Sequence, residues 1–387
     1  MHGDSTSWEL PEELRMLRDT IREFVQKEVQ PAEYGLDPDT FELPAERLAP
    51  LQQKAKSLGL WCIESPAKYG GAGLNLLAQC IVVEEAAKCK MGQYFPAAGA
   101  FGIDPPNIIF KGTPDQIQRY GIPGIQVGVR AFVAISEASG GSDPARAIGT
   151  RAVRRANRYI LNGSKMWIGA ADHSSWGVVF ARTGGPGRSG ITCFIVDNDT
   201  PGMSVKPIRV MRSYSPTEIT FQDAEIPIEN RLGEEGQGFE LASEWLVHGR
   251  VPYSAGCIGA AQAALDMAVK YAKQREVFGS PLSEKQGIQW MLADSEVELR
   301  AARLLIWQAA WHGDLGRDIK VDSSVAKLYA TETAFRVVDR CMQIFGGLGV
   351  AKELPLERWF RELRIKRIGE GPSEVHRMVI ARDVINR

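Results

Sequence analysis

One residue type able to do acid–base chemistry stands between two glycines, Glu370 in the run Gly369-Glu370-Gly371-Pro372-Ser373-Glu374-Val375-His376-Arg377, which opens the last predicted helix. Its glycine neighbours bring few side-chain atoms, so a carboxylate at this position can approach a substrate carbon closely. A bound substrate that excludes water would raise the pKa of Glu370 towards the working pH of an enzyme. A carboxylate in such a setting can act as a general base. The simpler alternative is a solvated glutamate in a turn.

Two other segments have small residues beside predicted strands, Ile135-Ser136-Glu137-Ala138-Ser139-Gly140-Gly141-Ser142-Asp143 and Lys165-Met166-Trp167-Ile168-Gly169-Ala170. Glycines and serines let backbone N–H groups and hydroxyls approach a polar ligand closely. Taken alone, the first segment is equally consistent with an ordinary loop, and Trp167 favours a core position over a cofactor contact. Two more motifs end helices, one from Tyr271 to Leu282 and one from Gln343 to Gly349.

The usual motifs of several enzyme classes are missing. The sequence has no G-x-x-x-x-G-K-[ST] loop, no complete G-x-G-x-x-G fingerprint and no G-x-S-x-G elbow. Two S-x-x-K matches, Ser65 with Lys68 and Ser324 with Lys327, lack the accompanying hydrolase motifs, and chance explains them. We therefore expect neither a P-loop, nor a Rossmann domain, nor a hydrolase.

Composition and charge exclude further classes. The 6 cysteines and 5 histidines show no metal-ligand spacing, so we expect no metal. The net charge of -1 gives no overall field that favours nucleic acid or an anionic membrane. The N-terminal residues lack the pattern of a signal peptide, and the apolar segment Val251–Val269 contains Gln262 and Asp266. We expect a cytoplasmic protein with reduced cysteines.

The elements that must position these residues divide the chain into three regions. Residues 1–129 have helical periodicity, residues 130–236 alternate with period two, and residues 237–387 return to long helices. Asn162-Gly163 is predicted to be the two-residue loop of a hairpin. In the last region, a stripe with alternating steps of four and three predicts a packed bundle; its members are Ile288, Leu292, Ser295, Leu299, Ala302, Ile306 and Ala309. The fold class is α+β.

In this order and spacing, the motifs resemble those of the acyl-CoA dehydrogenase family, and the segment from Tyr271 to Leu282 is the most specific match. The resemblance covers nearly the whole chain. It implies an N-terminal helical domain, a middle β-barrel or sandwich domain and a C-terminal four-helix bundle. It also implies an FAD-dependent enzyme that dehydrogenates an acyl-CoA thioester between Cα and Cβ, since flavin N5 can accept a hydride that no side chain can accept.

The resemblance assigns roles to particular residues. Glu370 would remove the α-proton, and Gly249, which matches the base position of other family members, cannot. Ser142 and Arg250 would contact the substrate. The FAD-binding positions would be Ile135, Ser136, Ser142, Trp167, Ile168, Gly169, Arg275, Phe278, Gln286, Gln343, Gly346 and Gly347. Arg275 and Gln343, with Gly346 and Gly347, match positions that reach the FAD of a neighbouring subunit, which implies a homodimer or tetramer. For Arg275, the alternative is a surface salt bridge.

Some positions depart from the family pattern. Gly169 stands where threonine is common, Val247 where aspartate is common, and Pro372 where threonine is usual, so the Gly-Glu-Gly-Pro-Ser-Glu-Val-His form indicates a less typical branch. Two alternatives stay open: an acyl-CoA oxidase or desulfinase-type activity on an unusual thioester, and an inactive scaffold. The expected partners are acyl-CoA and an electron-transfer flavoprotein. The acyl chain and the choice between oxygen and a partner flavoprotein are not legible in the sequence.

Overall fold

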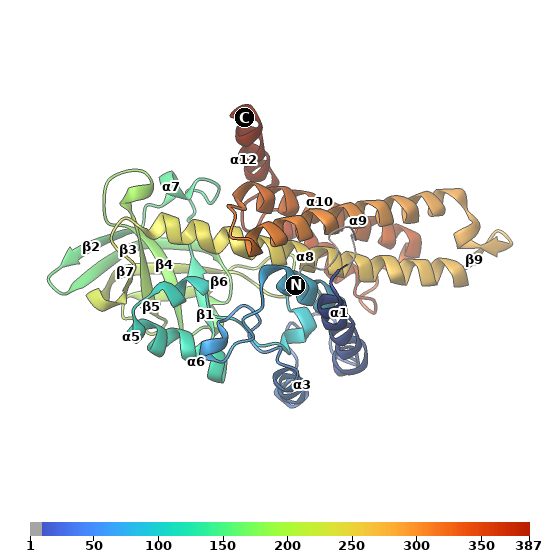
Figure 1. The fold of residues 1–387 in the computed structure, drawn as a ribbon, viewed down its shortest axis with the longest axis horizontal. Helices are drawn as coiled ribbons and strands as arrows, with labels where there is room; N and C mark the ends of the chain where they lie inside the picture. The colour runs from blue at the N-terminus through green and yellow to red at the C-terminus, as the bar shows by residue number, and fades with distance from the viewer. Residues whose placement is uncertain (1–9) are drawn as a thin grey trace.

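The computed structural model describes residues 10–387. The molecule is elongated, with a β-sheet at one end and a bundle of long helices running to the other (Figure 1). Shorter N-terminal helices pack against one side of the bundle. This arrangement confirms the predicted α+β fold with its helical, sheet and helical parts. Within the described residues, none of the helices combines the length and apolarity that crossing a lipid bilayer requires.

The N-terminal part consists of short helices around α4. Its α-helices are α1 (Glu12–Phe24), α2 (Gln30–Ala32), α3 (Ala45–Ser57), α4 (Leu76–Ala86), α5 (Pro114–Gln116) and α6 (Ile122–Val127). A π-helical turn, Val25–Val29, joins α1 to α2. Helix α4 is apolar on nearly all sides because it lies between α1 and the bundle.

The middle part is one eight-stranded sheet with the order β6-β7-β3-β2-β4-β5-β8, and β1 pairs in parallel with β4. The strands are β1 (Ala131–Ala134), β2 (Arg151–Arg155), β3 (Arg158–Ile168), β4 (Trp176–Arg182), β5 (Ile191–Asp197), β6 (Met203–Pro207), β7 (Thr217–Pro227) and β8 (Arg231–Leu232). A short helix, α7 (Pro144–Ala147), follows β1. Both faces of the central strands are buried, since Val179 and Val178 of β4 belong to different hydrophobic clusters.

The predicted hairpin loop at Asn162-Gly163 is wrong. Strand β3 runs without interruption from Arg158 to Ile168, and the hairpin turn lies earlier, between Arg155 and Arg158. Gly163 instead forms an irregularity in the pairing with β7, where its φ is 144°. A Cβ there would lie 2.6 Å from Cα of Thr150, so the glycine permits a close backbone approach and does not mark a turn.

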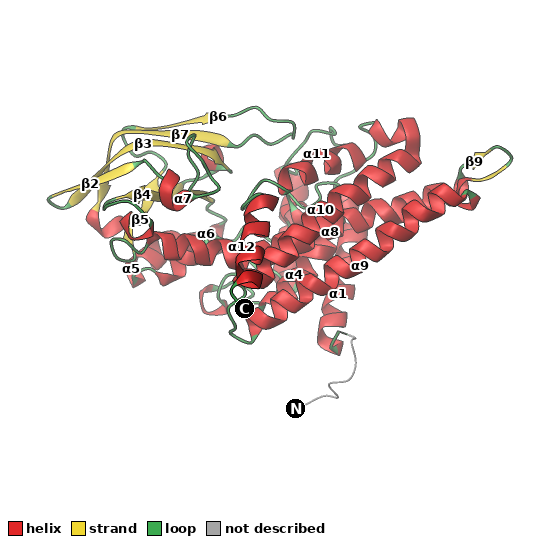
Figure 2. Cartoon of the chain, turned by 90° about the horizontal axis from the view of Figure 1, so that it is seen from above, coloured by secondary structure: helices red, strands yellow, loops and turns green. Residues whose placement is uncertain are grey.

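The C-terminal part is built on three long helices, α8 (Gly238–Gln274), α9 (Gln286–Asp314) and α10 (Lys320–Phe345), followed by α11 (Leu356–Lys366) and α12 (Ser373–Ile385). A small hairpin of β9 (Glu276–Val277) and β10 (Ser280–Pro281) joins α8 to α9 at the far tip (Figure 2). Helix α8 packs closely on α4 at Gly259. A Cβ at this position would lie 2.1 Å from the carbonyl oxygen of Glu84, so the close contact depends on a residue without a side chain.

Helix α9 has two contrasting faces. Its inward face buries the predicted stripe at Ser295, Leu299, Ala302, Ile306 and Ala309, and Ile288 and Leu292 pack against the same cluster. The bundle prediction is therefore confirmed for this helix. On its outward face, Trp290, Val297, Leu304 and Trp311 recur every seven residues, and each side chain is half or more exposed. This apolar row is called the α9 stripe below.

Candidate active site

The site is built on the turn between α11 and α12, which carries Glu370. Glu370 has a φ of 56° and Gly371 a φ of 100°, so both lie in a region that L-residues rarely adopt. Hydrogen bonds hold the turn in this conformation: Arg250 Nε donates to the carbonyl oxygen of Glu370 at 2.9 Å, and Lys327 Nζ donates to that of Gly371 at 2.6 Å. The strained turn is therefore fixed by buried cations from α8 and α10.

The Glu370 carboxylate itself is kept available. Its Oε2 atom is buried, and none of the residues that the structure describes forms a hydrogen bond with it. Burial raises the pKa of Glu370, while Lys366, Arg250 and Lys327 each oppose that rise. A Cβ at Gly249 would lie 4.0 Å from Glu370 Oε2, so this glycine of α8 lies directly opposite the carboxylate. A buried, unpartnered carboxylate with a raised pKa can act as a general base.

Lys327 and His376 were missed by the sequence reasoning. Lys327 is fully buried, and burial lowers its pKa to about 8. The His376 ring is also buried, and its pKa is lowered to about 3, so the ring is neutral and Nε2 can donate to the Gly371 carbonyl oxygen at 3.1 Å. A signal was present for Lys327, because it lies on the most buried face of α10, with Ala330, Ala334 and Cys341. A lysine at such a position needs a buried partner.

In the sheet, an ion pair joins the two segments predicted to contact the flavin. Lys165 Nζ lies 2.7 Å from Glu137 Oε1, and the Lys165 side chain is fully buried. Glu137 also accepts hydrogen bonds from the N–H groups of Gly149 and Thr150. Although burial raises the pKa of Glu137, its pairing with Lys165 leaves that pKa below the ordinary value. The ion pair thereby fixes the Ser136–Ser142 loop against β3.

The surface beside this ion pair is open and suits a flat ring. Trp167 has a φ of 66° and a side chain that is 56% exposed, which is unusual for a tryptophan at the end of a strand. A Cβ at Gly169 would meet no atom within 4 Å. The Ile168 side chain, in contrast, lies in the sheet core, so only its backbone can contact a ligand. Ser136, Ser142, Trp167 and Gly169 therefore fit the isoalloxazine and pyrophosphate of FAD.

The remaining predicted FAD positions gather at the tip of the bundle. Arg275 and Phe278 lie in and beside the β9–β10 hairpin, and Phe278 is 99% exposed. Gln343, Gly346 and Gly347 end α10 near the same tip, since the rings of Phe345 and Tyr271 stack at 4.4 Å. Within the described residues, the Arg275 side chain makes no ion pair, so the salt-bridge alternative receives no support in a single chain.

One chain therefore does not bring all the predicted FAD positions together. The sheet set includes Trp167 of β3 and belongs to the sheet at one end of the elongated molecule, whereas the tip set includes Arg275, directly before β9, and belongs to the bundle tip at the other end (Figure 1). Glu370, Arg250 and Gly249 do come together, at the α11–α12 turn and on α8. The tip set is free to contact a different molecule.

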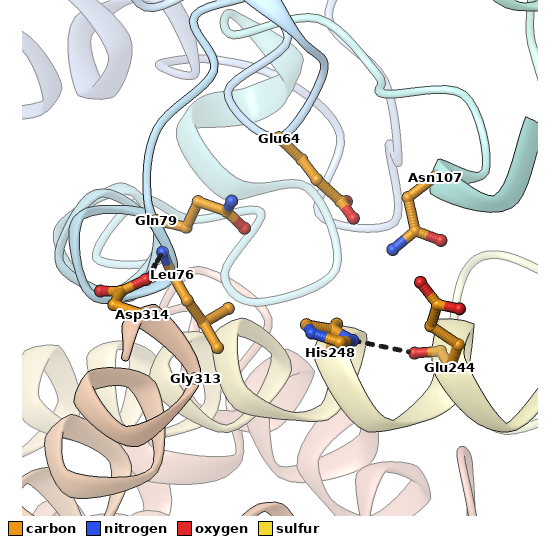
Figure 3. A pocket seen from close by; sticks show the side chains of 8 residues that line it. All are labelled: Glu64, Leu76, Gln79, Asn107, Glu244, His248, Gly313 and Asp314. Carbon is orange, nitrogen blue, oxygen red and sulfur yellow. Dashed lines mark hydrogen bonds between the residues drawn. The ribbon is translucent and has the colours of Figure 1, made fainter. Parts of the chain in front are cut away.

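A polar cavity of about 260 Å³ opens between the N-terminal part and α8 (Figure 3). Glu64, Asn107 and Glu244 point into it, and His248 lies on its floor, with Nδ1 3.2 Å from the Glu244 carbonyl oxygen, which accepts the hydrogen bond. Burial and the nearby Asp104 raise the pKa of Glu64 to about 7. None of the residues predicted to bind FAD or substrate lines this cavity. Its carboxylates and amides favour a polar occupant.

Comparison with protein families gives matches along nearly the whole chain. The family model described as "Acyl-CoA dehydrogenase, N-terminal domain" matches residues 11–126. The models of the middle domain and the C-terminal domain of the same family match residues 132–224 and 236–385. The three matches follow one another in the order of the three structural parts.

Curated relatives and solved structures agree with the family matches. The chain is 38% identical to the short-chain specific acyl-CoA dehydrogenase of Rattus norvegicus mitochondria, over 98% of this chain and 92% of the relative. It is 32% identical to butyryl-CoA dehydrogenase from Megasphaera elsdenii, with a TM-score of 0.86 and coverage of 98% and 100%. A chain from a structure described as the electron transferring flavoprotein of Acidaminococcus fermentans is 33% identical, with a TM-score of 0.87 and coverage of 99% and 100%.

Proposed function

The chain belongs to the acyl-CoA dehydrogenase family, and from that premise we propose that Glu370 is the base of its reaction. The enzyme is an FAD-dependent oxidoreductase that dehydrogenates acyl-CoA thioesters. The observation that supports Glu370 most directly is its buried Oε2 atom, which has no hydrogen-bond partner among the described residues and lies opposite Gly249 of α8. Because Gly249 has no side chain, it places no side-chain atoms between α8 and the carboxylate.

Each part of the turn contributes to the removal of the α-proton. Burial raises the pKa of Glu370 and makes the carboxylate a stronger base than an exposed glutamate. The bonds from Arg250 and Lys327 hold the backbone of residues 370–371, so the carboxylate keeps its direction during the reaction. Bound FAD would supply the acceptor for the hydride of the β-carbon, so that the substrate would lose two electrons as its C=C bond forms.

The flavin would be held by both sets of predicted residues, one from each of two chains. Trp167, Gly169, Ser136 and Ser142 offer the open surface beside the Glu137–Lys165 ion pair. Arg275 of a second copy, at the tip of its bundle, would pair with the pyrophosphate, for which a planar guanidinium is well suited. Because the two sets lie at opposite ends of one chain, this assignment requires a homo-oligomer.

The α9 stripe supports such an assembly. Trp290, Val297, Leu304 and Trp311 form an exposed apolar row on the outward face of α9, next to the helix end that carries the hairpin. Heptad spacing is the pattern by which two helices pack side by side. A second copy of the chain is the occupant that would cover this row and bring its own tip residues towards the sheet of the first.

Electron transfer from the reduced flavin completes the proposed cycle. The similarity to a chain of the Acidaminococcus fermentans electron transferring flavoprotein structure supports an electron-transfer flavoprotein as the acceptor. An acyl-CoA oxidase would instead pass electrons to oxygen. Reduced enzyme mixed with air-saturated buffer should remain bleached for much longer than one turnover with a partner flavoprotein. Immediate reoxidation by oxygen would identify an oxidase.

Glu370→Gln tests the proposed base. The variant should bind FAD and fold normally, because the amide has the same shape, but an acyl-CoA that bleaches the wild-type flavin under anaerobic conditions should leave the variant yellow. The expected loss of turnover is about a hundredfold or more, within the range of general acid–base catalysis. Glu374→Gln, an exposed change in the first turn of α12, is the matched control. Near-normal bleaching of the Glu370→Gln enzyme would overturn the assignment.

A further inference from the structure

Lys366, the last residue of α11, is a buried cation without a counter-ion in contact. Lys366 is only 7% exposed to solvent. Within the described residues, its Nζ atom makes no hydrogen bond or ion pair, and its recorded neighbours are the faces of two aromatic rings, Tyr253 at 4.5 Å and Tyr94 at 5.5 Å from the ring centroids. Burying an ammonium in this way is costly unless an acceptor or anion joins it.

The Lys366 ammonium lies close to Glu370, and both residues lie against the same face of α8. Gly249 faces Glu370 Oε2, and Tyr253 follows it by four residues, which is about 6 Å along a helix. The Tyr253 hydroxyl donates to the carbonyl oxygen of Lys366 at 3.4 Å, and it lies 3.1 Å from where a Cβ at Gly369 would be. Lys366 therefore lies next to Glu370 on the side of Tyr253.

The surroundings of Lys366 are polar where an aliphatic chain would need apolar contacts. The ring of Tyr94 lies 5.0 Å from that of Tyr214, and the Arg212 guanidinium covers Tyr94 at 4.5 Å. Gln93 Oε1 is buried and has no hydrogen-bond partner among the described residues. A purely hydrocarbon acyl group would leave this atom unsatisfied.

The charges around the site are predominantly positive. Arg250, Lys327 and Lys366 all act on Glu370, which as the base is the negative charge at their centre. The neighbouring Glu362 is already paired with Arg358 at 3.0 Å. Burial lowers the pKa of Lys366 to about 8, so its charge is not fully stabilised by the groups around it. One further anion at Lys366 would correct this imbalance and would satisfy the ammonium with a charge-assisted hydrogen bond.

We propose that the acyl group of the substrate ends in a carboxylate, and that this carboxylate binds the ammonium of Lys366 between the rings of Tyr94 and Tyr253. The substrate class is a short ω-carboxyacyl-CoA. The inference rests on the proposed dehydrogenation at Glu370 and adds to it the identity of the distal group. Lys366 is then the residue that selects the substrate, and Glu370 the residue that reacts with it.

The first test compares substrates of equal chain length with the wild-type holoenzyme. Glutaryl-CoA is paired with pentanoyl-CoA, and adipyl-CoA with hexanoyl-CoA, using flavin bleaching and kcat/KM with an artificial electron acceptor. In at least one pair, the carboxylated substrate should be favoured by about tenfold or more, the effect of one charged hydrogen bond. A preference for the plain acyl-CoA in both pairs would overturn the proposal without touching the role of Glu370.

The second test replaces the cation. Lys366→Met should reduce the ratio of kcat/KM for the carboxylated substrate over its plain partner by about 10- to 100-fold. Lys366→Arg should keep most of the ratio, and Lys270→Met, an exposed lysine on α8, should leave it unchanged. If Lys366→Met slows both substrates equally and the ratio stays constant, Lys366 acts only on Glu370 or on the fold, and the proposal is wrong.

A binding measurement separates this inference from the proposed function. Dissociation constants of glutaryl-CoA and pentanoyl-CoA are measured by calorimetry in the Glu370→Gln background, with and without Lys366→Met. The Lys366 change should weaken only the carboxylated ligand. Equal weakening of both ligands would contradict the inference, whereas turnover by Glu370→Gln alone would contradict the proposed function. Should Lys366→Met fail to fold, the wild-type substrate ratio and Lys366→Arg still decide the question.

Discussion

Glu370 combines an unfavourable backbone conformation with a carboxylate left without a partner. Its φ of 56° is held by bonds to the main chain of residues 370 and 371, and none of these bonds uses the carboxylate. The cations that hold the turn also oppose the rise in the pKa of Glu370 that burial causes. The same side chains therefore position the base and moderate its strength. Removing one of them should change both properties.

Lys327→Met separates these two effects. Loss of the charged hydrogen bond to the Gly371 carbonyl oxygen should lower the free energy of unfolding by about 1.5–3 kcal/mol. Because Lys327 lowers the pKa of Glu370, its removal should raise that pKa further. A base works in its deprotonated form, so activity is lost as the pH falls through this pKa. The acid limb of the kcat/KM profile should therefore move to higher pH.

The measurement is a pH–rate profile of the variant beside the wild type, with urea denaturation for stability. Lys320→Met, an exposed change at the start of α10, is the matched control and should alter neither. An acid limb that stays in place, or moves to lower pH, would show that Lys327 does not act on the base.

At the scale of the elements, periodicity predicted the helices and the sheet but not the bends within them. The inward face of α9 could be read from its steps of three and four, because that face packs against the bundle along its whole length. Asn162-Gly163 resembled a hairpin loop, yet the close approach of Thr150 and the bonds between Asn162 and Asp223 keep the chain straight there. Such contacts come from strands distant in sequence and leave no local signal.

The candidate site, like the helices and strands, could be predicted from the sequence only in part. Glu370 and Arg250 were predicted from the resemblance, and the structure places them in contact through the Glu370 carbonyl oxygen. Lys366 and Glu137 were not singled out, because a charged residue in a sequence is usually on the surface. Their burial becomes visible only when α11 meets α8 and when the Ser136–Ser142 loop meets β3.

The Glu137–Lys165 ion pair should matter for the stability of the sheet and for FAD binding. Lys165→Met leaves the Glu137 carboxylate buried without its cation, which should cost about 3–5 kcal/mol in the free energy of unfolding. The Ser136–Ser142 loop should then leave β3, and the purified protein should contain less FAD. The measurements are urea denaturation and the ratio of flavin to protein absorbance.

Two further variants make this prediction specific. Lys206→Met removes an exposed lysine from β6 and should change neither quantity. Glu137→Leu combined with Lys165→Met removes both charges and should recover much of the lost stability, since no buried charge is left unpaired. A single Lys165→Met variant with wild-type stability and full FAD would show that the ion pair holds nothing in place.

At the scale of the whole molecule, the structure separates the two sets of residues predicted to hold one cofactor. The sheet end offers Trp167 and the bundle tip offers Arg275, with the length of α8 and α9 between them. A single chain cannot close this distance without unfolding its longest helices. The exposed α9 stripe runs along α9, from close to the hairpin at the tip back into the bundle. We therefore expect assembly and cofactor retention to depend on the same surface.

Val297→Glu combined with Leu304→Glu tests this dependence. The two residues lie at the middle of the α9 stripe and point away from the core, so the fold of the single chain should survive the change. A carboxylate buried between two chains is costly without a partner, and the assembly should dissociate to monomers at micromolar concentration. Each monomer then keeps Trp167 but lacks the Arg275 of a neighbour, so FAD should be lost together with the assembly.

Multi-angle light scattering and the flavin-to-protein ratio measure the two effects, and Met16→Glu on α1, also an exposed apolar position, should change neither. If the double variant becomes monomeric yet keeps its full FAD, Arg275 does not serve a neighbouring chain. If it stays assembled, the stripe is not the contact.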